Sequence, residues 1–360
     1  MTQLQQPDID LSRKEQFAGR LVEALNAGAM SMMLSIGHRT GLFDTMSEMD
    51  AATVEQIAEQ AKLQPRYVRE WLGAMVTWQV VEYDPALRTY TLPAEHAAML
   101  TRAATPENIA GSMQWFSVLG GVEDEVVRCF RDGGGVPYER FNRFHEVMAE
   151  ESLQTVVAAL FDHILPLAPG IQKRLEAGID VCDVGCGSGW ALMAMAEQYP
   201  ASQFTGYDFF PAAVQRARDE AQRRGLTNVR FEVRDAAKID EPESFDLITT
   251  FDAIHDQVDP ATVLRNIFGA LRSGGTYLAQ DIRASSHLEN NLDHPVAPFL
   301  YTISTMHCMT VSLAHCGCGL GTCWGEEMAL RMFREAGFSS VDVHTLEHDI
   351  MNNFYIMRKP

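Results

Sequence analysis

These 360 residues carry a formal net charge of −19 at pH 7, and 46% of them are hydrophobic. A chain of this length and apolar content can bury the core of one large domain or of two smaller ones. The negative charge repels phosphate backbones and anionic lipid surfaces, and no local cluster of Lys and Arg offsets it. We therefore expect neither nucleic acid nor a membrane as a partner.

The first 14 residues are polar, contain one proline and are predicted to form a loose tail. They lack the basic and apolar regions of a signal peptide, and the sequence contains no run of the roughly 18 apolar residues that a transmembrane helix needs. We therefore expect a cytoplasmic protein. Its seven cysteines are odd in number and irregularly spaced, which favours reduced thiols over a disulfide framework.

Residues 16–36 have the periodicity of a helix with a wide apolar surface. Phe17, Leu21, Leu25 and Met32 lie near one stripe, and small residues separate them. This apolar surface is wider than a helix needs to pack against a single neighbouring element. It therefore suggests that the helix forms the interface of a homodimer. Ordinary core packing is the alternative for such a methionine-rich helix.

A pattern of helix, helix and hairpin follows. Thr53 and Gln56 form a capping box for a short helix, Pro65 opens a second helix, and residues 80–92 predict two short strands. This order is typical of a winged helix, a fold that often binds DNA. Residues 1–100, however, hold eight Lys or Arg against thirteen Asp or Glu. We therefore interpret residues 1–100 as a winged-helix-like dimerisation domain rather than as a DNA-binding one.

Residues 101–169 are predicted to be mainly helical and to link the N-terminal domain to a third region, residues 170–360. They carry several aromatic side chains on amphipathic helices. Such side chains usually belong to a core, but some of them are expected to line a substrate cavity.

The most informative stretch is residues 179–189, which have the sequence I-D-V-C-D-V-G-C-G-S-G. An apolar run ends in three alternate glycines, Gly185, Gly187 and Gly189, and helix-forming residues follow. Strand, glycine turn and helix together aim free backbone N–H groups at a ligand. Because a dinucleotide fingerprint would need glycine where Trp190 stands, this spacing indicates a different nucleotide-like cofactor.

Asp208 closes the next hydrophobic run, about 20 residues further on, where a carboxylate can accept hydrogen bonds from both hydroxyl groups of a ribose. Strands and helices then alternate toward the C-terminus. This alternation predicts an α/β fold with a doubly wound, mostly parallel sheet.

Residues 170–360 resemble the class I S-adenosylmethionine-dependent methyltransferases, whose sheet is Rossmann-like. In that family the first strand ends in an acidic residue and G-x-G-x-G, matched from Asp183 to Gly189, and the second ends in a ribose-binding acid, matched by Asp208. An acidic residue beside the adenine is matched by Asp235. The resemblance implies S-adenosylmethionine as cofactor and a closing antiparallel hairpin at residues 341–357. The implied cofactor-binding residues are Asp183, Gly185, Cys186, Gly187, Gly189, Asp208, Phe209, Asp235, Ala236 and Phe251.

The order of winged helix, helical linker and methyltransferase domain is similar to that of small-molecule O-methyltransferases, in which the first domain dimerises and helps to wall the substrate pocket. The resemblance implies methyl transfer to an oxygen, sulfur or nitrogen atom of a small molecule. Two alternatives stay open, a winged-helix regulator that senses S-adenosylmethionine and a thiol or metalloid methyltransferase.

The pair His255-Asp256 follows the fourth strand of this domain. In plant-type O-methyltransferases a His-Asp pair at this place supplies the general base, although Gln257 stands here where a tryptophan commonly follows. An imidazole with an ordinary pKa near ~6.5 can take a proton from a phenol or thiol at neutral pH. The alternative is that His255 only orders the loop over the cofactor.

Residues 283–325 form an insertion longer than the connection usual in the family, and are predicted to be a lid. It contains Cys308, Cys316, Cys318 and Cys323. Their spacing lacks the C-x₂-C pair of structural zinc sites, and the glycines between them suggest a flexible loop. We therefore predict free cysteines and no metal site, with the binding of a soft metal or metalloid as the alternative.

Overall fold

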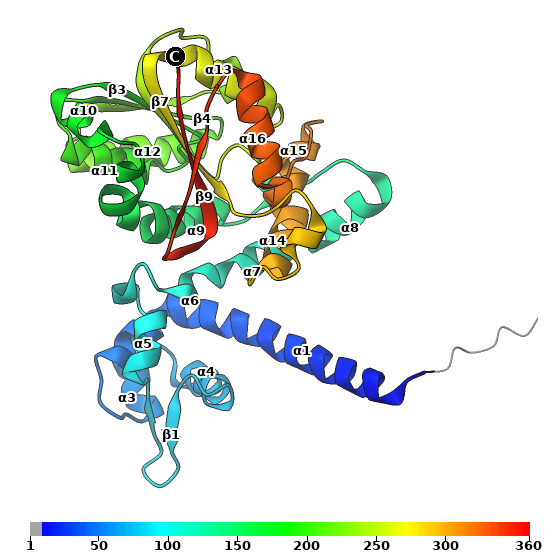
Figure 1. Ribbon diagram of the computed structural model, residues 1–360. Helices are drawn as coiled ribbons and strands as arrows, with labels where there is room; N and C mark the ends of the chain where they lie inside the picture. The colour runs from blue at the N-terminus through cyan, green and yellow to red at the C-terminus, as the bar shows by residue number, and fades with distance from the viewer. Residues whose placement is uncertain (1–8) are drawn as a thin grey trace, which may run out of the picture. The chain divides into compact units, whose positions relative to one another are not determined.

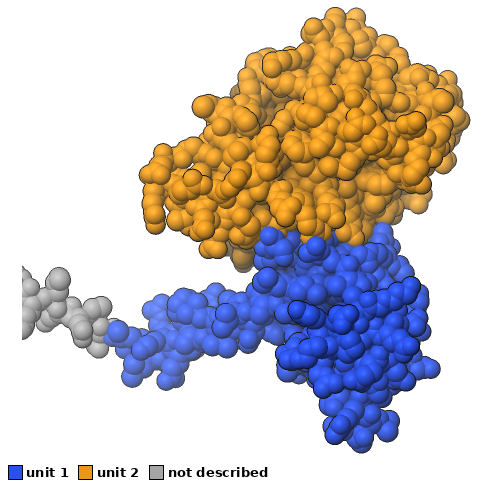
Figure 2. All heavy atoms as spheres, turned by 180° about the vertical axis from the view of Figure 1, so that it is seen from behind, with its two compact units in different colours: residues 1–117 blue, residues 118–360 orange. Residues whose placement is uncertain are grey.

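The computed structural model describes residues 9–360. They divide into two compact units, the first ending at residue 117 and the second comprising residues 118–360 (Figure 2). The predicted helical linker, residues 101–169, is shared between the two units. Residues 11–14 of the predicted tail already belong to a helix, so the prediction was wrong for them, and the tail before residue 9 lies outside the described residues. Among the described residues, no helix has the length and apolar character needed to cross a membrane.

The first unit begins with the 30-residue helix α1, Leu11–Thr40. The carboxylate of Asp10 caps its first turn, and Gly41 ends it in the left-handed conformation. The helices α3 and α4 and the hairpin of β1 and β2 confirm the predicted winged helix (Figure 1). The other elements of this part of the chain are α2 Leu42–Ser47, α3 Val54–Ala61, α4 Pro65–Thr77, β1 Glu82–Asp84, β2 Thr89–Thr91, α5 Ala94–Leu100, η1 Arg102–Ala104, α6 Ile109–Ser112 and α7 Gln114–Gly120, the last of which extends past residue 117.

The core of the first unit lies between α1 and α4. The rings of Phe43 and Trp71 meet edge to face at 5.2 Å, and the indole N–H of Trp71 donates to the carbonyl of Met33 at 2.9 Å. Gly37 makes this packing possible, because a Cβ atom there would lie 2.6 Å from both rings. The last turns of α1 are therefore firmly attached to the winged helix.

The second unit is built on a seven-stranded sheet with the order β5-β4-β3-β6-β7-β9-β8. The strands from β5 to β7 are parallel, whereas β9 runs antiparallel to both β7 and β8. This arrangement confirms the predicted doubly wound sheet and its closing hairpin. The strands are β3 Asp180–Val184, β4 Gln203–Asp208, β5 Val229–Val233, β6 Phe245–Phe251, β7 Leu271–Ile282, β8 Asp342–Leu346 and β9 Asp349–Arg358.

Helices cover both faces of this sheet (Figure 1). Alternate side chains of a strand point to opposite faces of the sheet and pack against the helices there. On β3, Val181 packs with the helices α10, α11 and α12, whereas Cys182 packs with α13 and α16. Strand order reverses between β3 and β6, so the crevice at the carboxyl ends of these strands is the expected ligand site. The helices are α10 Ile171–Ala177, α11 Trp190–Gln198, α12 Pro211–Arg224, α13 Pro260–Ala270 and α16 Gly325–Ala336.

The remaining segments of the second unit are mainly helical. Before the sheet they are α8 Glu123–Asp132, η2 Tyr138–Arg140, α9 Phe144–Ser152 and the turns η3 Leu153–Val157, η4 Leu160–Ile164 and η5 Leu165–Leu167; the short turns η6 Ala236–Lys238, η7 Leu288–Asn291 and η9 Thr322–Trp324 occur later. The predicted lid contains α14 Ala297–Ile303, the π-helical turn η8 Ser304–Cys308 and α15 Met309–Ala314. The lid cysteines were predicted to share one flexible loop, but Cys308 is buried in this helical part, whereas Cys316 and Cys318 are exposed.

Candidate functional site

The glycine turn after β3 is closely packed on both sides. Gly185 and Gly189 have φ angles of 77° and 73°. A Cβ atom at Gly185 would lie 2.5 Å from the Cβ of Ala253, and one at Gly189 would lie 2.4 Å from the ring of Phe231. Both conformation and space therefore require glycine at these two positions.

The N–H groups of this turn are largely engaged within the protein. Those of Gly185 and Cys186 donate to the carbonyl of Tyr207 at 2.8 and 3.0 Å, and that of Gly187 donates to Oδ2 of Asp208 at 2.9 Å. The expectation that free N–H groups face a ligand was wrong for these three residues. Among the three glycines, only Gly187 has open space where a side chain would stand, so a ligand would reach the backbone of the turn there.

Asp208 ends β4 at the same edge of the sheet. Its Oδ2 accepts from Gly187, and its Oδ1 accepts from the N–H of Phe210 at 2.8 Å. Burial raises the pKa of this carboxyl group. Each oxygen retains further acceptor capacity, which two ribose hydroxyls could use. The adjacent Phe209 is 42% exposed, so its ring is available for contact with a ligand.

Asp183 has a different position, inside the sheet. It is buried, and its Oδ1 accepts from the hydroxyl of Thr249 on β6 at 2.7 Å. Burial raises the pKa of Asp183 to about 7. The hydrogen bond from Thr249 to Asp183 therefore links β6 to β3.

Asp235 follows β5 and caps η6 by accepting a backbone hydrogen bond at 3.0 Å. Ala236, the first residue of that turn, is buried. The N–H of Arg234 donates to the carbonyl of Asp208 at 2.8 Å, which joins the ends of β4 and β5. Phe251 is the last residue of β6 and is half-buried. Apart from Asp183, the predicted cofactor residues thus gather at the carboxyl edge of β3 to β6.

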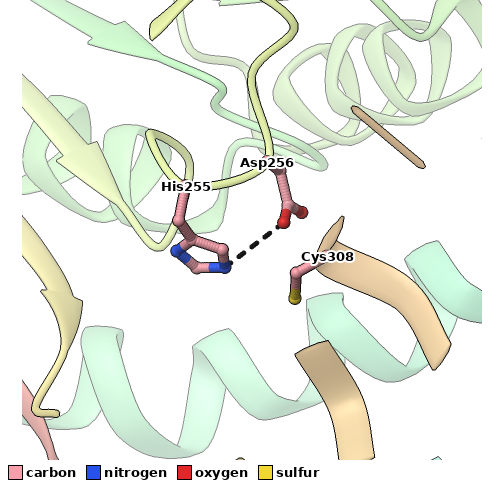
Figure 3. Close-up of side chains that lie close together, drawn as sticks. All are labelled: His255, Asp256 and Cys308. Atoms are coloured by element: carbon pink, nitrogen blue, oxygen red, sulfur yellow. Dashed lines mark ion pairs between the residues drawn. The ribbon is translucent and has the colours of Figure 1, made fainter. Parts of the chain in front are cut away.

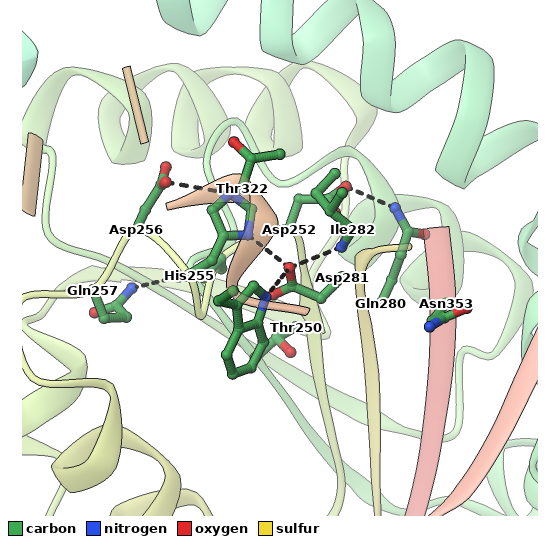
Figure 4. Close-up of polar contacts among 12 residues, drawn as sticks. Thr250, Asp252, His255, Asp256, Gln257, Gln280, Asp281, Ile282, Thr322 and Asn353 are labelled. Carbon is green, nitrogen blue, oxygen red and sulfur yellow. Dashed lines mark hydrogen bonds and ion pairs between the residues drawn. The ribbon is translucent and has the colours of Figure 1, made fainter. Parts of the chain in front are cut away.

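His255 lies in the loop between β6 and α13 and is 3% exposed. Its Nδ1 atom is 2.7 Å from Oδ1 of Asp281, near the end of β7 (Figure 4). The same oxygen accepts from the indole N–H of Trp324 at 2.9 Å and from the N–H of Ile282 at 2.8 Å. Asp281, which the sequence analysis missed, therefore fixes the orientation of the imidazole.

Asp256, the predicted partner of His255, lies on the other side of the ring. Its Oδ1 is 3.3 Å from Nε2 of His255 but forms no hydrogen bond, and its Oδ2 accepts from the hydroxyl of Tyr138 at 2.8 Å. The carboxylate that is hydrogen-bonded to the imidazole is therefore Asp281, whereas Asp256 makes an ion-pair contact with the other ring nitrogen.

Acidic groups outnumber basic ones around His255. Burial alone would lower the pKa of His255, but the carboxylates of Asp281 and Asp256 outweigh it and hold that pKa well above its ordinary value. Asp252, which follows β6 with a φ of 51°, is buried as well, and burial together with Asp281 raises its pKa to about 8. Its Oδ2 accepts from the amide of Gln280 at 2.8 Å. The carboxyl group of Asp252 is therefore mostly protonated at neutral pH, and the negative charge next to His255 comes from Asp281 and Asp256.

Cys308 reaches the same place from the lid. The donor atoms of His255, Asp256 and Cys308 lie within 4.8 Å of one another (Figure 3). Cys308 is 5% exposed, and burial raises the pKa of its thiol to about 11. The site thus combines two adjacent residues of one loop with a third residue about 50 positions further along the chain.

Aromatic rings connect the His255 loop with the cofactor edge. Tyr138, which donates to Asp256, meets Phe209 edge to face at 5.2 Å, and Phe144 stacks on His307 at 4.0 Å. Burial lowers the pKa of His307 to about 4. Aromatic residues of the predicted linker therefore do border the candidate site.

Comparison with known proteins identifies both parts of the chain. Residues 28–102 match the family described as Rv2258c-like winged HTH domain, and residues 175–337 match a family described as methyltransferase domain. The 27-O-demethylrifamycin SV methyltransferase of Amycolatopsis mediterranei (strain S699) is 30% identical over 138 residues, which are 37% of this chain and 48% of that protein. Methyltransferase ungE′ of Aspergillus campestris (strain IBT 28561) is 25% identical over 66% of this chain and 67% of that protein.

The chain spans less than half the length of the first curated relatives that it matches. Among solved structures, human N-acetylserotonin methyltransferase in complex with S-adenosylmethionine superposes with a TM-score of 0.65 at 16% identity and covers 100% of this chain and 99% of its own. At such low identity the likeness shows the fold alone. Both domain matches agree with that fold, so the chain carries a winged-helix domain at residues 28–102 and belongs, through residues 175–337, to the proteins with a methyltransferase domain.

Proposed function

We propose that this protein transfers a methyl group from S-adenosylmethionine to an oxygen atom of a small molecule. The observation that carries the proposal is the buried pair of His255 and Asp281, which lies beside the carboxyl edge of the sheet. The name of the Amycolatopsis relative specifies methylation at an oxygen, which supports oxygen over sulfur or nitrogen here.

The residues at the edge fit such a cofactor. In the proposal, Asp208 accepts hydrogen bonds from the ribose hydroxyls, the backbone from Gly185 to Gly189 contacts the methionine part, and Asp235 with Ala236 borders the adenine. Phe209, exposed and next to Asp208, contacts the same ligand. The acidic surroundings of His255 favour a sulfonium charge in this place.

When bound, S-adenosylmethionine supplies a methyl group that is open to in-line attack. The protein must then align the acceptor and remove its proton. Nε2 of His255 takes that proton when the imidazole is in its neutral form, because Nδ1 is already held by Asp281 at 2.7 Å. The carboxylates that hold the pKa of His255 well above its ordinary value make the neutral ring a stronger base, so methylation is expected to increase with pH. Asp281 stabilises the imidazolium that results, and the buried position of both side chains keeps water from competing.

The first unit supports the further proposal of a homodimer. Along α1, Phe17 is 57%, Leu21 55% and Leu25 72% exposed. A stripe of large apolar side chains on a 30-residue helix loses contact with water when a second copy packs on it.

A DNA-binding regulator is less well supported. On α4, the arginines that could contact phosphates are engaged with carboxylates, Arg66 with Glu70 at 2.5 Å and Arg69 with Glu55 at 3.0 Å. The opposite face of α4 is buried in the core through Trp71. Together with the acidic balance of residues 1–100, these pairs weaken the attraction to a phosphate backbone.

A screen of phenolic and other hydroxyl-bearing acceptors with S-adenosylmethionine tests the proposal, with release of S-adenosylhomocysteine as the readout. Methylation that falls sharply in His255→Ala, while cofactor binding persists, is the expected result. Methylation by His255→Ala at the rate of the unchanged protein would remove His255 from the proposed role.

A further inference from the structure

The sulfur of Cys308 has no task in the proposed methyl transfer, yet it lies beside His255 and Asp256. We propose that these three side chains bind a divalent cation of the zinc class, and that the bound ion prevents His255 from acting as a base. The binding site stands on its own geometry. Only its effect on the reaction rests on the proposed function.

The three donor atoms are arranged as metal ligands are. Nε2 of His255, a carboxylate oxygen of Asp256 and Sγ of Cys308 lie within 4.8 Å of one another. Ligands around one tetrahedral zinc ion are ~3–4 Å apart. Nε2 of His255 and Oδ1 of Asp256 are 3.3 Å apart in an ion-pair contact that is not a hydrogen bond, a separation that two ligands of one zinc ion can have (Figure 3).

The environment of one carboxylate oxygen of Asp256 is a second, independent indication that a cation binds here. Oδ1 of Asp256 is inaccessible to solvent and has no hydrogen-bond partner. A buried carboxylate oxygen without a partner is costly, whereas coordination to a cation would satisfy it. The ion-pair contacts of Asp256 are with two histidines, His255 at 3.3 Å and His307 at 3.8 Å.

Neighbouring residues already orient two of the ligands. Asp281 accepts a hydrogen bond from Nδ1 of His255, so Nε2 is the ring nitrogen that can coordinate a metal ion (Figure 4). Tyr138 donates to Oδ2 of Asp256, so Oδ1 is the carboxylate oxygen that stays available for coordination. A carboxylate behind a histidine ligand is the usual support of such a site, since it fixes the ring and makes the coordinating nitrogen more basic.

The donor set selects the metal. One thiolate, one imidazole and one carboxylate suit zinc, whereas magnesium and calcium prefer oxygen donors alone. A neutral imidazole, a thiolate and a carboxylate together balance the charge of a dication, so the complex can stay buried. Three protein ligands leave a fourth position open, as in zinc sites that also bind water or a substrate oxygen.

Metal binding and proton transfer compete for one atom. Nε2 of His255 can coordinate the ion or accept the proton of the acceptor, but it cannot do both. Because Cys308 comes from the lid and His255 from the loop after β6, the ion would also tie the lid to that loop. Bound zinc is therefore expected to inhibit methyl transfer.

The test titrates Zn²⁺ into metal-stripped full-length protein in competition with a chromophoric chelator. The proposal predicts one Zn²⁺ per chain, with affinity reduced about 100-fold or more in both Cys308→Ser and Asp256→Asn. Co²⁺ in place of Zn²⁺ should give a thiolate charge-transfer band that Cys308→Ser abolishes. The double variant Cys316→Ser, Cys318→Ser is the matched control, because these cysteines are exposed and should not affect the site.

Absence of Zn²⁺ binding by the folded, unchanged protein would overturn the proposal, and so would unchanged affinity in Cys308→Ser. Loss of binding in the control variant alone would overturn it too, because it would move the site to the exposed cysteines. Circular dichroism of each variant shows whether it is folded, and two isosteric variants at different ligands guard against the misfolding of one.

A second measurement separates this inference from the proposed function. Stoichiometric Zn²⁺ should lower the methylation rate of the unchanged protein at least tenfold, reversibly with chelator, and each ligand variant should be inhibited less relative to its own metal-free rate. Zn²⁺ binding that leaves the rate unchanged would overturn the blocking role. Zn²⁺ binding by a protein that binds no S-adenosylmethionine would contradict the proposed function and leave the metal site in place.

Discussion

Nδ1 of His255 and Oδ1 of Asp281 lie 2.7 Å apart although 26 positions separate the two residues in the sequence. Strand pairing produces this contact. β6 and β7 are parallel neighbours, so the loop after β6 and the end of β7 meet at the same edge of the sheet. The residue adjacent to His255 in sequence, Asp256, is in contrast further from the ring and not hydrogen-bonded to it.

This geometry predicts different effects for two similar substitutions. Asp281→Asn should lower kcat about 100-fold or more, because the imidazole loses both its orientation and the charge that stabilises its protonated form. Asp256→Asn, which leaves that hydrogen bond in place, should lower kcat less. Steady-state kinetics with a methylated acceptor, together with calorimetry of cofactor binding, measure both effects. A larger loss of kcat in Asp256→Asn than in Asp281→Asn would contradict this prediction, because it would show that Asp256 rather than Asp281 positions the imidazole.

That the glycine turn and Asp208 meet at one edge of the sheet could be predicted, because they form local patterns. Gly185 to Gly189 follow the buried strand β3 and Asp208 ends the neighbouring β4, and parallel strands bring such positions together whatever the rest of the fold does. Even there, a pattern of glycines could not show that their N–H groups are used by Tyr207 and Asp208, since that depends on the register of β3 and β4.

The chemistry beside His255 was less predictable, because it depends on contacts between distant segments. Asp281 belongs to no motif, and only the pairing of β6 with β7 brings it to the imidazole. The lid cysteines were grouped by their closeness in sequence, but a π-helical turn buries Cys308 whereas Cys316 lies on an exposed segment. π-helical turns often occur at functional sites, but the periodicity of apolar residues in the sequence does not predict where they form.

The exposed stripe of α1 predicts that a charge placed within it dissociates the dimer. Leu25→Asp should convert a dimer to a monomer, because a carboxylate would have to be desolvated at the interface. Glu23→Lys, on the opposite side of the same helix, should leave the dimer intact. Analytical ultracentrifugation gives the mass of each variant. A monomeric unchanged protein would contradict the dimer proposal.

Packing in the first unit predicts opposite signs for two glycine substitutions. Gly37→Ala should destabilise the protein by about 1–3 kcal/mol, because the new methyl group would lie 2.6 Å from the rings of Phe43 and Trp71. Gly73→Ala, in α4 with open space around it, should stabilise by about 0.5–1 kcal/mol through its higher helix propensity. Urea unfolding of both variants measures the change. Equal stability of the two would show that α1 is not closely packed against these rings.

The half-buried His145 predicts how stability depends on pH. The ring of His145 stacks on Phe210 at 4.1 Å, and burial, with a contribution from Arg216, lowers the pKa of His145 to about 4. The unfolded chain has a pKa near ~6.5 at this residue, so between the two values the unfolded state binds more protons. This contribution to stability is present above pH ~6.5 and is lost as the pH falls toward about 4.

The variant His145→Phe isolates this effect, because it keeps the stacked ring and removes the titrating group. Between pH 7 and pH 5 the unchanged protein should lose on the order of 1–2 kcal/mol more than the variant. The comparison uses urea unfolding at both pH values. Parallel pH dependence of the two proteins would mean that His145 is not buried in its neutral form.

The cofactor site is the central claim, and calorimetric titration with S-adenosylmethionine tests it most directly. The unchanged protein should bind one molecule per chain, and Asp208→Ala should bind it about 10- to 100-fold more weakly, because hydrogen bonds to a charged acceptor are lost. Asp235→Ala, whose carboxylate caps a surface turn, should weaken binding less. Failure of the folded, unchanged protein to bind S-adenosylmethionine, or equal affinity in Asp208→Ala, would contradict the account.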